Sequence, residues 1–335
     1  MLRLLHRLNI DPYLLLLVST VGLASLAPPQ GAATEIVGGV ADAAIALLFF
    51  LHGAKLSRAA VLDGVRAWKL HLTVACLTFV IFPMLGLGVW AIPGVEPSLR
   101  SGLLFLTLLP STVQSSIAFT AIARGNVAAA VCSASFSNLA GIFITPLLTA
   151  MFITGNARGF SADAIVAISL QLLLPFLTGH LLRPWIGSFV QRHKQVLGYT
   201  DRASILLVVY SAFGAAVLEG IWRKVTLGEM GLVVALSLTL LAAIMTIGSM
   251  MSRMFGFSVE DRIVVLFCGS KKSLATGVPL AGVLFPAAQV GAIILPLMFF
   301  HQIQLMVCAV LARKIANRPD IESAQYPDTM AASAR

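Results

Sequence analysis

Ionisable side chains are scarce in this 335-residue chain, and their scarcity excludes most classes of soluble protein. Only 11% of the residues are charged, whereas 58% are hydrophobic. Soluble domains carry about 25% charged residues. Negatively charged residues are rarer than positively charged ones, with 14 Asp and Glu against 23 Lys and Arg. We therefore expect an all-α polytopic membrane protein that lies in a lipid bilayer.

The chain also lacks the patterns that metal centres, disulfide frameworks and enzymes require. Its four cysteines lie in apolar segments without the spacing of metal ligands. There is no His-Glu-x-x-His motif, no Gly-rich phosphate loop, and no nucleophile beside a base and an orienting acid. The basic residues are scattered over short loops, which disfavours a nucleic-acid partner. We predict that the protein is not an enzyme and has no cofactor.

Ten apolar segments can be marked along the chain, and each is expected to form a transmembrane helix. The polar stretch 186–202 is expected to be the longest internal loop and to be partly helical. Arg3 and Arg7 precede the first segment without a clear cleavage site, which predicts a retained first helix. The segments cover residues 12–27, 37–54, 70–92, 101–123, 127–153, 163–185, 203–222, 230–251, 262–285 and 290–311.

The distribution of Lys and Arg over the loops predicts the orientation. Seventeen of the 23 fall on one side and four on the other, and the remaining two are Lys271 and Lys272. Positive loops face the cytoplasm, so we predict that both termini are cytoplasmic. The expected location is the plasma membrane, in a bacterium the inner membrane.

Five spans in each half would give the halves opposite topologies, which is typical of an inverted repeat. We predict one repeat over residues 1–153, a second over 154–313, and a disordered cytoplasmic tail over 314–335. The fourth segment is interrupted at 110–116 and the ninth at 269–273. Interruptions at matching positions predict a transport site near the midplane.

Two adjacent lysines in the ninth segment are the most unusual feature of the sequence. A charge at the centre of a membrane helix costs roughly 2.5–3.5 kcal/mol on insertion scales. Lys271 and Lys272 are flanked by Ser270 and Ser273, with apolar chain on both sides. We interpret them as residues of a polar cavity. The alternative is a helix end from which the ammonium groups reach the lipid headgroups.

Polar residues follow Pro110 in the fourth segment, namely Thr112, Gln114, Ser115 and Ser116. Proline removes a backbone hydrogen bond and opens the helix, so these side chains are candidates to contact a ligand. Gln114, Ser115 and Ser116 are expected to share a cavity with Lys271 and Ser273. The alternative is that each serine bonds the carbonyl four residues before it.

Two further segments contribute candidates for the substrate and coupling-ion site. In the fifth segment these are Ser133, Ser137 and Asn138, whose small size could instead serve close helix packing. In the tenth they are His301 and Gln302. A histidine at this depth could relay protons or be a bundle residue with its hydrogen bonds satisfied.

Four motifs together resemble the bile acid:sodium symporter family, and more closely its SBF-like branch. They are Leu-His-Gly-Ala-Lys-Leu-Ser at 51–57, Leu-Pro-Ser-Thr-Val-Gln-Ser-Ser at 109–116, Ala-Arg-Gly-Asn at 123–126, and 269–275. The resemblance implies ten helices in two inverted five-helix repeats. Helices one, two, six and seven would form a panel domain and the other six a core domain. Broken helices four and nine would cross near the midplane, with the sodium sites around the crossing.

The chain departs from the family pattern at the residues that bind sodium. No carboxylate or amide remains in the ninth-helix motif, and two ammonium groups stand where oxygen ligands are expected. Whether sodium binds is therefore uncertain. The family's glutamate, glutamine and asparagine of helix nine fall at Phe267, Lys271 and Lys272, its third-helix glutamine near Thr78, and its fourth-helix Ser-Asn pair at Ser115 and Ser116.

These observations favour a secondary transporter that moves a small organic, anionic solute by alternating access. The lysines would replace sodium by their own charge, attract the anion, or carry a proton. Two alternatives remain open. One is a membrane regulator of calcium homeostasis with little transport of its own, and the other is a conventional sodium-coupled symporter.

Overall fold

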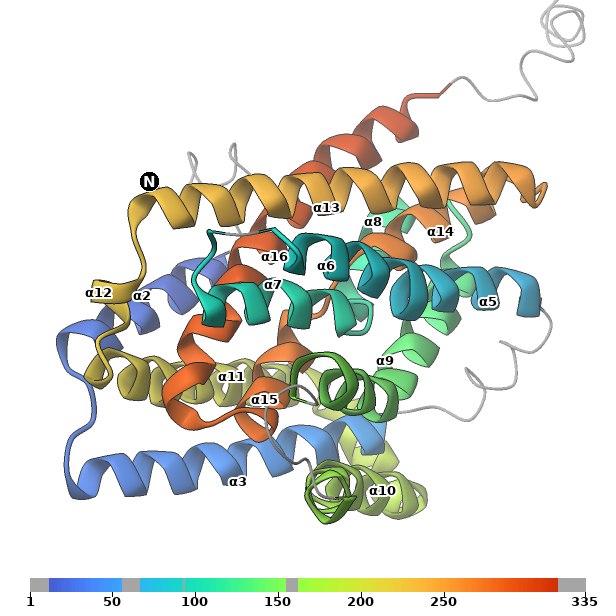
Figure 1. Ribbon diagram of the computed structural model, residues 1–335. Coiled ribbons are helices and arrows are strands. Elements are labelled where there is room, and N and C mark those ends of the chain that lie inside the picture. Colours follow the sequence, from blue (N-terminus) through green and yellow to red (C-terminus); the bar gives the residue numbers. More distant parts are fainter. Residues whose placement is uncertain (1–11, 56–66, 93, 155–161, 319–335) are drawn as a thin grey trace, which may run out of the picture.

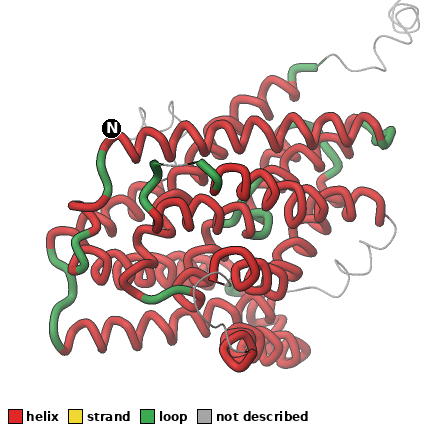
Figure 2. Tube along the Cα trace, viewed as in Figure 1, coloured by secondary structure: helices red, strands yellow, loops and turns green. Residues whose placement is uncertain are grey.

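The computed structural model describes residues 12–55, 67–92, 94–154 and 162–318, and in these ranges the chain consists of helices and loops. Figure 2 shows how short most of the loops are. The helices are α2 (Pro12–Leu26), α3 (Ala32–Lys55), α5 (Trp68–Cys76), π-helix η2 (Leu77–Ile81), α6 (Phe82–Trp90), α7 (Pro97–Leu108), α8 (Val113–Ile122), α9 (Val127–Thr149), π-helix η3 (Ala150–Thr154), α10 (Ala162–Arg192), α11 (Lys194–Leu218), α12 (Ile221–Lys224), α13 (Leu227–Met254), α14 (Val259–Ser270), α15 (Leu274–Leu284) and α16 (Ala287–Ala316).

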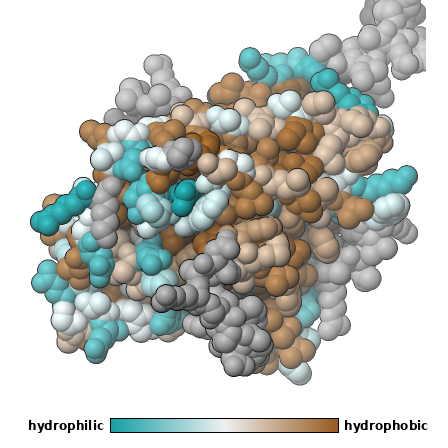
Figure 3. All heavy atoms as spheres, viewed as in Figure 1, coloured by the Kyte–Doolittle hydropathy of each residue, from teal (hydrophilic) through white to brown (hydrophobic). Residues whose placement is uncertain are grey.

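The outer surface of the helices is apolar, as a bilayer requires. Leu26, Leu72, Met84 and Leu227 are each at least 60% exposed. Figure 3 shows a broad hydrophobic area over the visible face, with hydrophilic residues gathered in the left part of the view and along its upper right edge. An apolar area of this extent on a soluble monomer would be a liability, whereas lipid covers it without penalty.

The prediction of a helical membrane protein is confirmed, but the count of ten spans is confirmed only in part. Within the described ranges, seven helices are long and apolar enough to cross a bilayer, and the bent pair α7 and α8 raises the number to eight. Helix α2, which corresponds to the first predicted span, is too short to meet these criteria. Helix α2 has 15 residues. At about 1.5 Å per residue it is shorter than the hydrocarbon thickness.

Two sequence-based boundaries differ from the structure. The stretch 186–202, expected to be a partly helical loop, is helical over almost its whole length, because α10 extends to Arg192 and α11 begins at Lys194. The predicted disordered tail begins at 314, whereas α16 continues to Ala316. Residues 319–335 of that tail lie outside the described residues.

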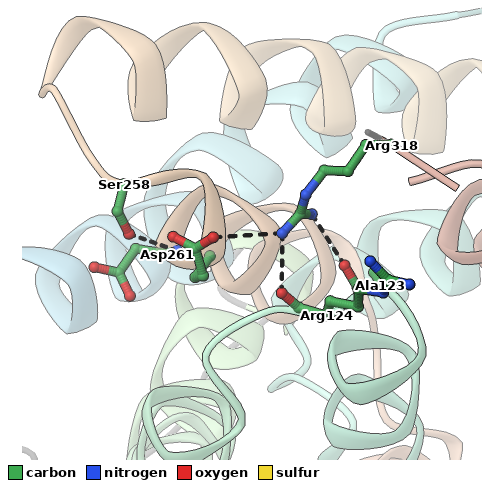
Figure 4. Close-up of polar contacts among 6 residues, drawn as sticks. Ala123, Arg124, Ser258, Asp261 and Arg318 are labelled. Atoms are coloured by element: carbon green, nitrogen blue, oxygen red, sulfur yellow. Dashed lines mark hydrogen bonds and ion pairs between the residues drawn. The ribbon is translucent and has the colours of Figure 1, made fainter. Parts of the chain in front are cut away.

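The end of α16 is attached to the rest of the protein by Arg318, at the top of the close-up in Figure 4. Its guanidinium donates to the carbonyl oxygens of Ala123 and Arg124 at 3.0 and 3.1 Å, and contacts the Glu260 carboxylate at 3.4 Å. The turn after α8 and the start of α14 are therefore tied to the end of α16.

Helices α14 and α15 form the centre of the molecule. Together they make an apolar span of 26 residues. In the apolar stretch of this span 89% of the residues are buried inside the protein, against 33–56% in the corresponding stretches of the other six unbent spans. The protein itself, and not lipid, therefore surrounds this pair. Gly269 lies inside α14, where a Cβ atom would come within 2.8 Å of the Leu77 side chain. Its role is close packing on η2, and the helix breaks two residues later.

Helices α3 and α10 pack with their backbones in direct contact. A Cβ on Gly53 would collide with the carbonyl of Phe176, and a Cβ on Gly179 would collide with the carbonyl of Phe50. Glycine at both crossing points allows this approach. Figure 1 shows the end of α3 beside α10 at the lower right.

Candidate functional site

Two broken helices meet at the centre of the protein. Helices α7 and α8 are separated by residues 109–112 with a bend of 60°. Helices α14 and α15 are separated by residues 271–273. The amide of Ser273 in the second break donates to the carbonyl of Pro110 in the first at 2.9 Å. Both interruptions lie where the sequence predicts them, although α8 resumes at Val113, earlier than expected.

The Lys272 ammonium occupies a cage of backbone carbonyls at this meeting point. Its Nζ donates to the carbonyl oxygens of Thr78, Thr107 and Leu109 at 2.9, 2.7 and 2.7 Å. The side chain is fully buried, and Nζ also lies 4.4 Å from the centre of the Phe82 ring. An ammonium has three N–H donors. All three are used here, so the buried charge is fully hydrogen-bonded.

Each of the three carbonyls is available because helical hydrogen bonding is interrupted beside it. In η2 the amide of Phe82 bonds Leu77, five residues before it. The next bond in that register would join Pro83 to Thr78, but proline has no N–H. Thr107 lies in the last turn of α7 and Leu109 in the break, where carbonyls lack helical partners. The ammonium also faces the negative end of the α7 dipole.

Side chains from other helices hold the backbone of Lys272 in place. Gln304 on α16 accepts from its amide through Oε1 and donates to its carbonyl through Nε2, both at 2.9 Å. The Thr112 hydroxyl donates to the same carbonyl at 2.8 Å. The site predicted from the sequence includes Thr112 but not Gln304. The sequence did contain a signal for Gln304, because it lies three residues after the candidate His301 and therefore on the same face of the helix.

The Lys271 ammonium lies in a different environment, among aromatic rings. Its Nζ is 3.8 Å from the centre of the Phe119 ring and 5.8 Å from that of Phe267. This side chain is also fully buried, and its Nζ has no hydrogen-bond partner in the described structure. The buried polar residues among the described ones include no carboxylate. The two lysines therefore carry charge without an acidic partner.

Several predicted site residues do surround the two breaks. The Ser137 hydroxyl accepts from the amide of Ser111 at 3.0 Å. The Ser116 hydroxyl donates to the carbonyl of Phe267 at 3.2 Å. Ser273 caps α15, accepting from the amide of Thr276 at 3.2 Å. Thr78 contributes its carbonyl and not its hydroxyl, which is buried without a partner.

Other predicted residues are not brought into this cluster. Gln114 is exposed in the first turn of α8, contrary to the expected inward orientation. The Ser270 hydroxyl bonds the carbonyl of Leu266, four residues before it, which was the alternative considered for serines in helices. Ser133 pairs with His71 at 2.7 Å.

The remaining candidates lie at the edge of the cluster. His301 contacts Gln304 at 2.9 Å and so supports the residue that holds Lys272. The Ser115 hydroxyl and the Gln302 carbonyl oxygen are buried without hydrogen-bond partners in the described ranges.

A narrow cavity lies next to the breaks, between α3 on one side and α9 and α15 on the other. Asn138 and Thr276 border it and are joined by a hydrogen bond of 2.8 Å. His52 of α3 borders it from the opposite side. The other lining residues are Leu48, Phe49, Ile142, Ala275 and Pro279. The start of α15, the positive end of its dipole, faces this space.

Comparison with known proteins agrees with the resemblance seen in the sequence. YfeH of Escherichia coli (strain K12), named as a candidate symporter, is 52% identical over 318 residues, which are 94% of this chain and 96% of that protein. Protein PA2026 of Pseudomonas aeruginosa is 54% identical over 314 residues, 92% of this chain and 94% of that protein. Sodium/bile acid cotransporter 7 of Rattus norvegicus is 25% identical over 329 residues, 94% and 95% of the two chains.

The model of the SBF-like CPA transporter family matches residues 11–317, which is most of the chain. The expectations of a transport protein with transmembrane helices, and of a protein that is not an enzyme, are therefore confirmed. The chain belongs to the SBF-like CPA transporter family.

Proposed function

We propose that this protein is a secondary active transporter of a small organic anion, and that Lys272 supplies permanently the positive charge that sodium supplies in sodium-coupled relatives. The observation that carries the proposal is the cage of three carbonyl oxygens around the Lys272 ammonium. Rings of backbone carbonyls are the ligands that proteins use for alkali cations. Here a covalently attached cation occupies such a ring.

The tethered ammonium would exclude a second cation from the same oxygens. Two unit charges about 3 Å apart repel by roughly 5 kcal/mol even at an effective dielectric constant of 20. Because of this repulsion, sodium should not bind at the crossing while the Lys272 ammonium occupies the carbonyl oxygens. We therefore expect transport to proceed when sodium is replaced by choline.

The narrow cavity bordered by His52, Asn138 and Thr276 is the proposed place of solute entry. At about 10 Å³ it is closed to an organic anion in this conformation, so entry requires α3 to move away from α9 and α15. Its position between α3 and the broken-helix region fits a panel domain that moves against a core domain. The positive end of α15 and the two buried lysines near it favour an anion over a cation. Lys271, whose ammonium has no hydrogen-bond partner among the described residues, is the charge best placed to respond when the site opens.

The proposed architecture keeps the ten spans, with α2, α3, α10 and α11 as the panel. The two halves, 1–153 and 154–313, would be inverted repeats, and both termini would lie in the cytoplasm of a bacterial cell. Reporter fusions after Arg100 and at the C-terminus test this topology. The Arg100 fusion should read periplasmic and the C-terminal fusion cytoplasmic, and the reverse pattern would refute it.

Purified protein should be screened by thermal shift against organic anions in sodium chloride and in choline chloride. Any stabilising anion should then be tested for uptake into proteoliposomes under the same two conditions. We expect equal binding and uptake in both salts. A saturable sodium requirement would favour conventional coupling, which the name of the 25% identical relatives suggests for those proteins. Binding of no solute would favour the regulator.

A further inference from the structure

A second, larger cavity lies away from the broken helices, where α10 ends, α11 begins and α3 ends. It has a volume of about 480 Å³. Lys55, His180, Arg183 and Lys194 line it, together with the polar residues Ser188 and Gln191. No acidic residue lines it in the described structure. The cavity is therefore strongly positive.

The cationic groups of this cavity are only partly neutralised. Lys55 pairs with the carboxylate of Asp201. Arg183 and Lys194 form no hydrogen bond or ion pair with any described residue, and Nδ1 of His180 is buried without a partner. Two unpaired cations and an unsatisfied imidazole nitrogen around one cavity would be stabilised by an anion with several oxygens.

The backbone adds further donors at the same place. Helix α11 has 25 residues and starts at Lys194, and the residue before it, His193, makes no side-chain cap. The first amides of a helix have no partner within the helix. The C-terminus of α10, the negative end of its dipole, lies at Arg192, two residues before Lys194, and offsets the positive end of α11, so the amides and not the dipole are the donors for a phosphate. Phosphate groups bind readily at such a terminus.

An apolar stripe leads from the cavity along the outside of α10. Leu174, Leu177, Leu181, Trp185 and Phe189 follow one another at intervals of three or four residues, and each is 46–75% exposed. This spacing places them on one face of the helix. Tryptophan is enriched where membrane meets water, so Trp185 marks the level of the headgroups.

We infer that this cavity binds the phosphate headgroup of an anionic phospholipid, with the acyl chains lying along the stripe of α10. A free phosphate ion would fit the cationic residues equally well, but the bilayer that covers the apolar stripe presents phosphate headgroups at the level of Trp185, beside the cavity. Basic pockets between membrane helices are known to bind such headgroups. The bound lipid would join α3, α10 and α11, which border the cavity, without any part in the transport site.

The test uses purified protein in zwitterionic detergent and measures thermal stabilisation by added lipid. Cardiolipin and phosphatidylglycerol should stabilise the wild type at low micromolar concentration, whereas phosphatidylcholine should not. Inorganic phosphate, as the free source of the same chemistry, should have little effect. Stabilisation by phosphate alone would overturn the assignment to a lipid.

Five variants make the test specific. Arg183→Gln and Lys194→Gln should each weaken the apparent affinity for anionic lipid about fivefold, and the double variant about thirtyfold. Gly187→Leu should block the cavity without changing charge, because a Cβ there already lies 3.4 Å from the Arg183 side chain. Arg253→Gln, an exposed arginine at the end of α13, is the matched control. Equal loss in the control, or none in the double variant, would refute the site.

Discussion

Replacing Lys272 by alanine is the sharpest test of the carbonyl cage, because it removes the cation and leaves its ligands. The carbonyls of Thr78, Thr107 and Leu109 would be left without donors. A buried unsatisfied group costs about 1–3 kcal/mol, so the three together cost about 3–9 kcal/mol. Removing a buried charge relieves about 3 kcal/mol of this.

The expected net destabilisation is therefore about 3 kcal/mol, on the order of 5–10 °C in the melting temperature. Sodium should reverse part of it. The space left by the side chain adjoins three oxygens that suit an alkali cation. Lys272→Ala should therefore gain a saturable stabilisation by sodium chloride that choline chloride does not give.

Lys272→Met is the matched control. It also removes the charge, but its unbranched apolar side chain fills most of the space, so sodium should not rescue it. Differential scanning fluorimetry of the three proteins in both salts is sufficient. The carbonyl cage is refuted as a cation site if Lys272→Ala melts like the wild type, or if the wild type itself is stabilised saturably by sodium.

Four further variants address the surroundings of the site. Lys271→Gln should weaken binding of a stabilising organic anion by about tenfold, whereas Lys271→Arg, which keeps the charge and can stack on Phe119, should weaken it less; equal losses would argue against a role for the charge. Gln304→Leu should lower the melting temperature by roughly 5 °C, since it leaves the amide of Lys272 unpaired and its carbonyl with the Thr112 hydroxyl alone; an unchanged value contradicts this. Arg318→Ala removes partly exposed contacts, so the melting temperature should fall by only about 1–3 °C in the same assay. A larger fall would show that the contacts of Arg318 stabilise the fold more than partly exposed contacts usually do.

Much of the fold follows from local chemistry that can be read in the chain. The scarcity of charge and the apolar runs require a helical membrane protein. Pro110 cannot donate a backbone hydrogen bond, so the break between α7 and α8 is predictable from one residue. The extent of helix in the polar stretch 186–202 was underestimated, because charged residues do not prevent a helix outside the apolar layer.

The carbonyl cage could not be foreseen, because it joins η2, the end of α7 and the start of the second break. The contribution of Thr78 depends on a π-helical register that places Pro83 opposite its carbonyl. Gln304 is more than 30 residues away in the chain from the backbone that it holds. Such contacts depend on how helices pack, which local sequence does not specify.

The sequence by itself determined that two adjacent lysines lie deep in an apolar span, where burying their charge is unfavourable unless other groups stabilise it. It suggested one shared site for the pair. Only the tertiary structure decided that the two ammonium groups lie in different surroundings. Lys271 has extended backbone geometry, with φ −95° and ψ 152°. Successive side chains of an extended segment point to opposite sides. One ammonium therefore reaches the three carbonyls while its neighbour lies against Phe119.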